Sequence, residues 1–337
     1  MASKRIESVD VAKGIAILSI VVGHVQFFDA GGYDVTGAWL YQFHVPLFFV
    51  VAGYFLSDKH RLRAFVAAKA FRLLVPYVLT AGVIVAVAAL LQATRGSTWP
   101  SVYAQPIDAL FAAAYGCGSW LVPTPAHIAP IGALWFLPAL FIALVVCRLL
   151  LQLKHGLLLT IPIAAVCLVS ARALWLPFSI QSAGVATLFV AAGYWLKGRS
   201  FLEKKPGPVL LLVCACVFVI AGIYNLHLSF ASLISLGNIA FSLVIALSSS
   251  VLVLFASRLV DDRVKPLSRV LAWFGRSSLV VLCAHALLLD VGLRTVIATT
   301  GLTGNALSAV DLAVQLAVLA ACVGAFKHVP GLRRVFY

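Results

Sequence analysis

The stretch VAKGIAILSIVVGHVQFF, residues 11–28, decides the class of fold, because it is apolar almost throughout. A run of about 20 mostly apolar residues lets an α-helix cross the hydrocarbon core of a bilayer. Only Lys13 and His24 within this run are titratable. We therefore predict a membrane-spanning helix that carries two titratable side chains.

The rest of the chain repeats this pattern. Of its 337 residues, 63% are hydrophobic and 11% are charged, against about 25% charged in soluble domains, and its mean hydropathy is +1.06. This composition excludes a disordered chain, a fibrous repeat and an ordinary cytosolic enzyme. It predicts an all-α, polytopic integral membrane protein with about ten transmembrane helices in a single domain, 1–337. The expected spans are 11–28, 38–56, 71–92, 133–152, 157–171, 180–196, 208–225, 230–257, 272–293 and 305–325.

The basic residues give this arrangement a direction. The formal net charge is +14, from 25 Lys and Arg against 11 Asp and Glu. Only Arg95, Arg172 and Arg294 lie in the connections of one side, so 22 of the 25 basic residues lie on the other. Cytoplasmic loops are enriched in Lys and Arg, so both termini are predicted to be cytoplasmic. Nucleic acid is not an expected partner, because the basic residues lie between apolar runs and form no single patch.

The seven cysteines do not indicate a metal site. Most of them fall inside apolar runs, and none is spaced as CxxC. Zinc sites in proteins use characteristic cysteine and histidine spacings. We interpret the cysteines as small apolar residues and expect no metal.

Titratable residues at membrane depth are costly, so each is a candidate site residue. Lys13 and His24 are eleven positions apart, which places them on one helix face about 16 Å apart. His44 lies near the end of the next expected helix, so the two histidines can face one cavity. The alternatives are histidines bonded to backbone carbonyls and a lysine that snorkels to the membrane surface.

The connection 57–72 is more basic than topology requires. It contains Lys59, Arg61, Arg63, Lys69 and Arg72. Lys69 and Arg72 are three residues apart and share a helix face, where two fixed cations can hold a phosphorylated ligand. The alternative is ordinary positive-inside charge that contacts anionic lipid headgroups.

Weaker candidates lie further along the chain. Trp135 opens the expected span 133–152, where an aromatic residue is often an interface anchor. His285 and Asp290 are five apart on the expected span 272–293, about 140° apart around the helix. Asp290 can orient a histidine, as a carboxylate does in a triad, or be an ordinary helix-end residue.

A set of short motifs resembles one family. The first motif is a basic residue and a histidine that are separated by ten residues. The motifs that follow are, in order, Phe-His-Val-Pro, Lys-Ala-Phe-Arg with Val-Pro-Tyr, Leu-Trp-Phe-Leu, and Phe-Gly-Arg-Ser-Ser-Leu with a later histidine. They lie at Lys13 to His24, Phe43–Phe55, Lys69–Arg72, Val75–Tyr77, Leu134–Leu137 and Phe274–Leu279 with His285. Together they are similar to the acyltransferase-3 family of membrane acyltransferases, in the branch that resembles fucose 4-O-acetylases.

The resemblance implies a reaction, a donor and a location. Members move an acyl group, usually acetyl, from cytoplasmic acyl-CoA to a hydroxyl of a glycan or lipid-linked sugar at the outer side. The expected location is a bacterial-type cytoplasmic (inner) membrane. Coenzyme A carries three phosphates, so Lys69 and Arg72 are expected to hold it, with Arg61 and Arg63 as reinforcement.

The resemblance also implies roles at the reacting atoms. His24 is expected to be the general base on the acceptor hydroxyl, and Lys13 to steady the donor or balance charge. The thioester oxyanion needs hydrogen-bond donors. The expected donors or substrate contacts are His44, Trp135, Ser277, His285 and Asp290. Direct transfer and an acyl-His24 intermediate both stay open.

Two departures and two rival functions accompany the resemblance. The basic residue before the ten-residue gap is often arginine in the family, and here it is Lys13. The glutamates that some members carry after the tryptophan are missing from Leu134–Leu140. A transporter or flippase for a lipid-linked or small polar substrate would share the helix count, although no inverted repeat is visible. In a structural or sensory protein, the basic loops would only set topology.

Overall fold

The computed structural model describes residues 6–28, 32, 34–59, 61–95, 103, 105–203 and 206–337. Almost all of them belong to helices or short connections, which confirms the all-α class. The longer helices are α1 (Glu7–Val25), α4 (Leu62–Arg95), α6 (Phe136–Leu150), α8 (Ile180–Gly198), α9 (Pro208–Ile223), α10 (Ile239–Arg263) and α14 (Gly304–His328).

Shorter elements connect these helices. The short helices are α2 (Val35–Leu40), α3 (Pro46–Tyr54), α5 (Pro106–Tyr115), α7 (Thr160–Ser170), α11 (Lys265–Arg276), α12 (Ser278–Asp290), α13 (Leu293–Ala298) and α15 (Pro330–Phe336). Three 3₁₀ turns, η2 (Gly132–Trp135), η3 (Gly156–Leu159) and η4 (Pro177–Ser179), precede α6, α7 and α8. Strands β1 (Leu228–Ser229) and β2 (Ile234–Ser235) form a small antiparallel hairpin that pairs Leu228 with Ser235.

Among the described residues, six helices are long and apolar enough to cross a membrane, and seven if the bent pair α11–α12 counts as one span. The six are α1, α4, α6 with its leading turn, α8 with its leading turn, α10 and α14. Helices α7 and α9 are apolar but shorter. The count of ten and the cytoplasmic placement of both termini stay predictions. Four basic residues in that topology count, Lys4, Arg5, Lys204 and Lys205, lie outside the described residues.

Three expected spans differ in the structure. The run 230–257 begins with a turn and strand β2 and becomes helical only at Ile239, where α10 starts. The other two runs are broken. The run 38–56 is not one helix, because residues 41–45 form turns between α2 and α3. Pro46 begins α3, and a proline is favoured at a first helical position because it has no N–H to donate. The run 272–293 is also divided, since α11 and α12 meet at Ser277 with an angle of 71°.

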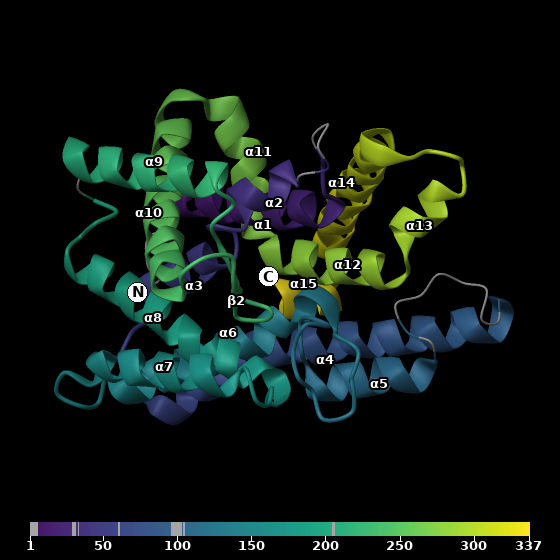
Figure 1. The fold of residues 1–337 in the computed structure, drawn as a ribbon, viewed down its shortest axis with the longest axis horizontal. Coiled ribbons are helices and arrows are strands. Elements are labelled where there is room, and N and C mark those ends of the chain that lie inside the picture. The colour runs from purple at the N-terminus through teal and green to yellow at the C-terminus, as the bar shows by residue number, and fades with distance from the viewer. Residues whose placement is uncertain are drawn as a thin grey trace.

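Helix α1 lies at the centre of the fold, with α10 and α14 on either side of it (Figure 1). It also packs along α11, where glycines let the two backbones approach closely. A Cβ on Gly14 would stand 2.0 Å from the carbonyl oxygen of Leu271, and one on Gly275 would stand 1.8 Å from that of Asp10. Small residues at helix crossings are typical of membrane bundles. This crossing holds α1 at Asp10 and Gly14, on either side of Lys13.

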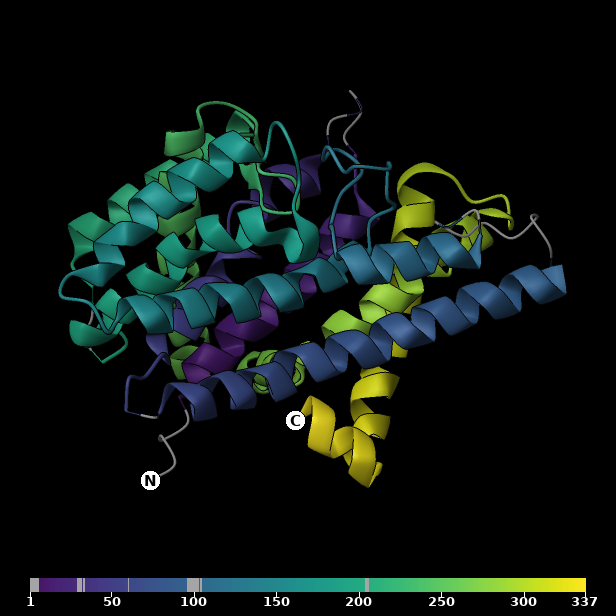
Figure 2. The same ribbon diagram turned by 90° about the horizontal axis from the view of Figure 1, so that it is seen from below.

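The outer faces of the bundle are apolar. Helix α4 runs along one side of the molecule (Figure 2). Helix α15, at the C-terminal end of the chain, lies near α4. Helix α9 exposes Val209 to 72% and Leu212 to 65%. Large exposed apolar side chains along a whole helix are expected where the neighbour is lipid. The exposed faces therefore agree with a multi-pass membrane protein.

Candidate functional site

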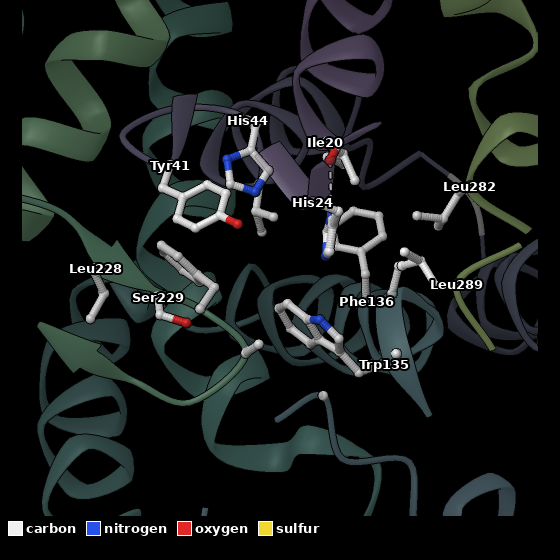
Figure 3. Close-up of a pocket in the computed structure, with 16 residues that line it drawn as sticks. Ile20, His24, Tyr41, His44, Trp135, Phe136, Leu228, Ser229, Leu282 and Leu289 are labelled. Atoms are coloured by element: carbon white, nitrogen blue, oxygen red, sulfur yellow. Dashed lines mark hydrogen bonds between the residues drawn. The ribbon is translucent and has the colours of Figure 1, made fainter. Parts of the chain in front are cut away.

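The first cavity surrounds His24 and encloses about 260 Å³. We name it the His24 cavity. His24 is exposed to this space, although most of α1 around it is buried. Side chains from α1, the 41–45 turn, η2, α12 and the β1–β2 hairpin line the cavity (Figure 3). Among its lining residues are Ile20, His24, Tyr41, His44, Trp135, Phe136, Ser229, Phe230, Leu282 and Leu289.

One hydrogen bond fixes which ring nitrogen carries the proton when His24 is neutral. Its Nδ1 lies 2.7 Å from the carbonyl oxygen of Ile20 (dashed line in Figure 3). A carbonyl oxygen only accepts, so Nδ1 must be the donor. The neutral ring then keeps its lone pair on Nε2. A general base needs such a free lone pair within reach of the proton it removes.

His44 reaches the same cavity from the turn between α2 and α3, not from a helix end as expected. Its Nδ1 donates to the Leu40 carbonyl oxygen at 2.8 Å. The neighbouring Tyr41 donates its hydroxyl to the Gly23 carbonyl oxygen at 3.0 Å, and the Tyr41 and His44 rings lie 4.9 Å apart. Tyr41 therefore ties the broken segment to α1 beside His24. The cavity brings His24, His44 and Trp135 together.

A second cavity, of about 370 Å³, lies at the other end of α1. We name it the Lys13 cavity. Four cationic side chains line it: Lys13, Lys69, Arg72 and Arg276. The ammonium of Lys13 is paired with Asp10 at 2.7 Å, so its charge is partly balanced. Such a cluster of cations suits a ligand with several phosphates.

The two cavities meet along one wall. Ile20, Phe136 and Leu282 line both of them. Along α1, the lining positions run Lys13, Ile17, Ile20 and His24, which is the spacing of a single helix face. The face inferred from the eleven-residue spacing thus runs from the cationic cavity to the histidine cavity.

Five expected site residues lie outside both linings: Arg61, Arg63, Ser277, His285 and Asp290. Arg61 and Arg63 are exposed, and neither lines the Lys13 cavity. Ser277 is buried at the bend between α11 and α12, and its Oγ accepts a hydrogen bond from the Tyr337 hydroxyl at 3.1 Å. Ser277 is therefore placed away from His24, and the geometry does not favour it as an oxyanion donor.

His285 and Asp290 face different neighbours. The His285 ring packs edge to face against the His24 ring, with centroids 5.1 Å apart. Asp290 instead accepts a hydrogen bond from the Tyr103 hydroxyl at 3.3 Å. The residue that orients His285 is Gln315, whose Oε1 lies 2.9 Å from Nδ1. The hydrogen bond that orients His285 is thus made with Gln315, while Asp290 at the end of α12 contacts Tyr103.

Sequence reasoning missed four residues of the site, among them Tyr41 beside His24. Arg276 and Tyr337 line the Lys13 cavity, whereas the sequence suggested only a topological role for Arg276 and a place in the Phe-Gly-Arg-Ser-Ser-Leu motif. Gln315 interrupts the apolar run 305–325. A buried amide in a membrane helix needs a partner, so its depth was the available signal. Among the described residues, no three His, Cys, Asp or Glu side chains gather as a metal site would require.

Comparison with known proteins decides the family. The family described as “Acyltransferase domain” matches residues 6–326, nearly the whole chain. The chain belongs to the acyltransferase-3 family. No significant match was found among curated proteins or among solved structures. The family and the apolar helices together identify a multi-pass membrane acyltransferase.

The matched range contains both cavities of the acyltransferase except the contribution of its last helix. Two residues beyond residue 326 also line the Lys13 cavity. They are Phe336, the last residue of α15, and Tyr337, which follows it. Tyr337 donates to Ser277, and Lys327 lies 5.9 Å from the Tyr337 ring centre. The C-terminal residues of this acyltransferase are thus packed into the wall of its cationic cavity.

Proposed function

We propose that this acyltransferase moves an acyl group, acetyl in the simplest case, from acyl-CoA to a hydroxyl of a glycan or lipid-linked sugar. The observation that carries the proposal is the junction of two chemically different cavities at Ile20, Phe136 and Leu282. Cations on one side suit the donor's phosphates. A base with a free lone pair on the other side suits an acceptor hydroxyl.

The residues then act in sequence. Lys69 and Arg72 bind the phosphates of coenzyme A, Arg276 adds a third cation, and the thioester reaches past Ile20. His24 Nε2 takes the proton of the acceptor hydroxyl while the oxygen of that hydroxyl attacks the thioester carbonyl. The carbon–sulfur bond breaks, the thiolate leaves, and the proton on His24 can neutralise it. In the alternative route, Nε2 attacks the thioester carbonyl first and expels the thiolate, which gives acyl-His24. The acceptor oxygen then takes the acyl group from His24, and the thiolate takes the acceptor's proton.

The finer features of the proposal follow the family resemblance. They are acetyl-CoA as donor, a cytoplasmic donor side, an outer acceptor side, membrane lipids as surroundings, and the fucose 4-O-acetylase-like branch. Lys13, paired with Asp10, balances charge between the two cavities. His44 and Trp135 are the oxyanion donors we favour, because both line the His24 cavity.

The test uses the purified protein with radiolabelled acetyl-CoA and a mixture of glycan acceptors. His24→Ala is expected to lose transfer by about 10²- to 10⁴-fold, the range of a general base, and to keep acetyl-CoA binding. Labelled acetyl retained on the unaltered protein, but not on His24→Ala, selects the acyl-His24 route. Full transfer by His24→Ala overturns the role of His24.

The donor site is tested with a matched pair of cation variants. Lys69→Ala and Arg72→Ala should each raise KM for acetyl-CoA, because both side chains line the cationic cavity. Lys59→Ala is the control, since Lys59 lies in the same basic connection but is exposed and outside the cavity. Equal effects of all three substitutions would show that only general positive charge matters. Movement of the acceptor across vesicles without acetylation would favour a transporter.

A further inference from the structure

A chain of polar side chains leads away from His24 into the helix bundle. His285 packs against His24 with ring centroids 5.1 Å apart, and its Nδ1 lies 2.9 Å from Gln315 Oε1. The Gln315 amide donates to Asp311 Oδ1 at 3.0 Å, and Asp311 Oδ2 pairs with Arg294 at 3.6 Å. The chain joins α12, α14 and α13 at one point, all behind the ring of His24.

The order of donors along this chain fixes the form of His285. Asp311 as a carboxylate only accepts, so the Gln315 amide nitrogen must face it. The Gln315 oxygen then faces His285 and accepts from Nδ1. The neutral His285 imidazole therefore has its proton on Nδ1 and its lone pair on Nε2. That Nε2 is buried and has no hydrogen-bond partner among the described residues.

Arg294 also holds the end of the helix that carries His24. Its Nη1 donates to the Val25 carbonyl oxygen at 2.8 Å, and its Nη2 donates to Ser308 Oγ at 3.2 Å. Ser308 in turn donates to the Gln26 carbonyl oxygen at 2.8 Å. The last carbonyls of a helix need such donors. One arginine thus connects the end of α1 to the residue that sets His285.

Stability alone does not account for this arrangement. The Arg294 side chain is 37% exposed, and an ion pair that water reaches contributes little to stability. Asp311 is 2% exposed at its side chain, and Gln315 and His285 are equally enclosed. Polar groups of this kind inside a membrane bundle are costly, and they commonly serve function.

We propose that His285 is a positioning residue whose neutral imidazole packs against the catalytic base, His24. Arg294, Asp311 and Gln315 act through His285 by holding its ring in this form. The inference rests on the proposed role of His24. When Nε2 of His24 takes the acceptor's proton, a cation forms beside His285. Because the neutral His285 ring keeps its proton on Nδ1, it places no second positive charge beside the cation on His24. Asp311 also offsets the nearby positive charge of Arg294.

Few other titratable groups face His24. His285 approaches from α12, and Tyr41 and His44 face the cavity from the 41–45 turn. Lys13 lies three turns away on α1 and is paired with Asp10. An altered charge in the Arg294–Asp311 pair is therefore expected to act on His24 through His285 and the end of α1.

The first test does not depend on activity. Nitrogen-15 NMR of the eight histidines in nanodiscs reports which ring nitrogen carries the proton, and His285→Phe assigns the His285 signal by its loss. Gln315→Met keeps the side-chain length but cannot accept from Nδ1, so the Nδ1–H form of His285 should be lost. Ser308→Ala leaves the Gln315–His285 bond intact and should not move this signal. An unchanged His285 signal in Gln315→Met overturns the proposal.

The second test measures acetyl transfer. His285→Phe and Gln315→Met should each lower kcat roughly tenfold, the equivalent of one neutral hydrogen bond, with KM for acetyl-CoA unchanged. Because they act along one path, the double variant should lose little more than His285→Phe alone. Independent structural defects would instead multiply, and that result contradicts the proposal.

The pH profile separates positioning from simple destabilisation. Asp311→Asn keeps an acceptor for Gln315 but leaves the charge of Arg294 uncompensated. A nearby positive charge disfavours protonated His24, so the acid limb of kcat should move to lower pH. A variant that is less stable but has an unchanged profile overturns the proposal. If the unaltered protein transfers no acyl group, the proposed function fails, and the NMR result still decides the positioning of His285.

Discussion

Substitution of Gly14 tests whether the α1–α11 crossing positions the catalytic face. A Cβ at Gly14 would lie 2.0 Å from the Leu271 carbonyl oxygen, whereas real Cβ contacts essentially never fall below 3.0 Å. Gly14→Ala must therefore separate the two helices by at least 1.0 Å. The obstructing atom belongs to the backbone, so no side-chain rotation relieves the clash. The displaced segment lies between Lys13 and His24.

The size of the effect follows from this displacement. Overpacking of a well-packed contact costs about 1–3 kcal/mol. A misplacement of about 1 Å at a reacting group can cost about 10²-fold in rate. We therefore expect Gly14→Ala to lower both the melting temperature and kcat, with the larger effect on kcat. Leu271→Ala added to Gly14→Ala should not restore either, because it leaves the carbonyl in place.

The assay compares two glycine variants in the same detergent. Unfolding is followed by the fluorescence of the seven tryptophans, and kcat by acetyl transfer. Gly324→Ala in α14 is the control, because no atom lies within 4 Å of its added Cβ, and an alanine in a helix interior is favoured over glycine by about 1 kcal/mol. If Gly14→Ala matched Gly324→Ala in both measurements, the reasoning from the crossing would be refuted.

Two further variants address the wall between the cavities and the outer connection. Leu282→Trp enlarges a side chain that both cavities share. Acetyl-CoA binding measured by calorimetry should persist, while kcat should fall by at least about tenfold, as for a misplaced reacting group. An unchanged kcat would contradict a path through this wall. Burial, together with the neighbouring Asp290, raises the pKa of Tyr103, so its stabilising contribution is present below the unfolded pKa of about 10 and is lost as pH rises above it. Tyr103→Phe should be less stable at pH 8 but lose less melting temperature between pH 9 and pH 11 than the unaltered protein, and an equal loss would argue against this role of the phenol.

Hydropathy predicted where the helices lie better than how they meet. The runs that became α4, α6, α8, α10 and α14 were visible because each is long and nearly free of charge. Their neighbours were not visible, since a helix that contacts lipid on one side and protein on the other is apolar on both. The packing of α12 against α14, which brings Gln315 to His285, could not be read from either segment alone.

The spacing argument on α1 succeeded for a specific reason. Lys13 and His24 are the titratable residues of the run 11–28 and lie on one regular helix, α1, in the structure, so their angular separation follows from helix geometry alone. The same method separated His285 and Asp290 by about 140° on α12, and they do face different neighbours. It could not relate α12 to the residues of α11, because the two helices meet at Ser277 with a bend of 71°. A regular helix is the condition under which spacing predicts a shared face.

The two breaks inside the expected spans 38–56 and 272–293 indicate where the site is. Irregular backbone inside an apolar run is tolerated only where it is buried in protein or lines a cavity. The 41–45 break contributes Tyr41, His44 and Val45 to the His24 cavity. The bend at Ser277 places Gly275, Arg276 and Ser278 on the Lys13 cavity. Each break thus supplies polar groups to one end of the catalytic face of α1, at the cost of helical hydrogen bonds that an uninterrupted span would have kept. In this acyltransferase, Pro46 and the Gly275-Arg276-Ser277 segment were the sequence signals for those breaks, and they mark the two cavities as directly as the histidine and the cations do.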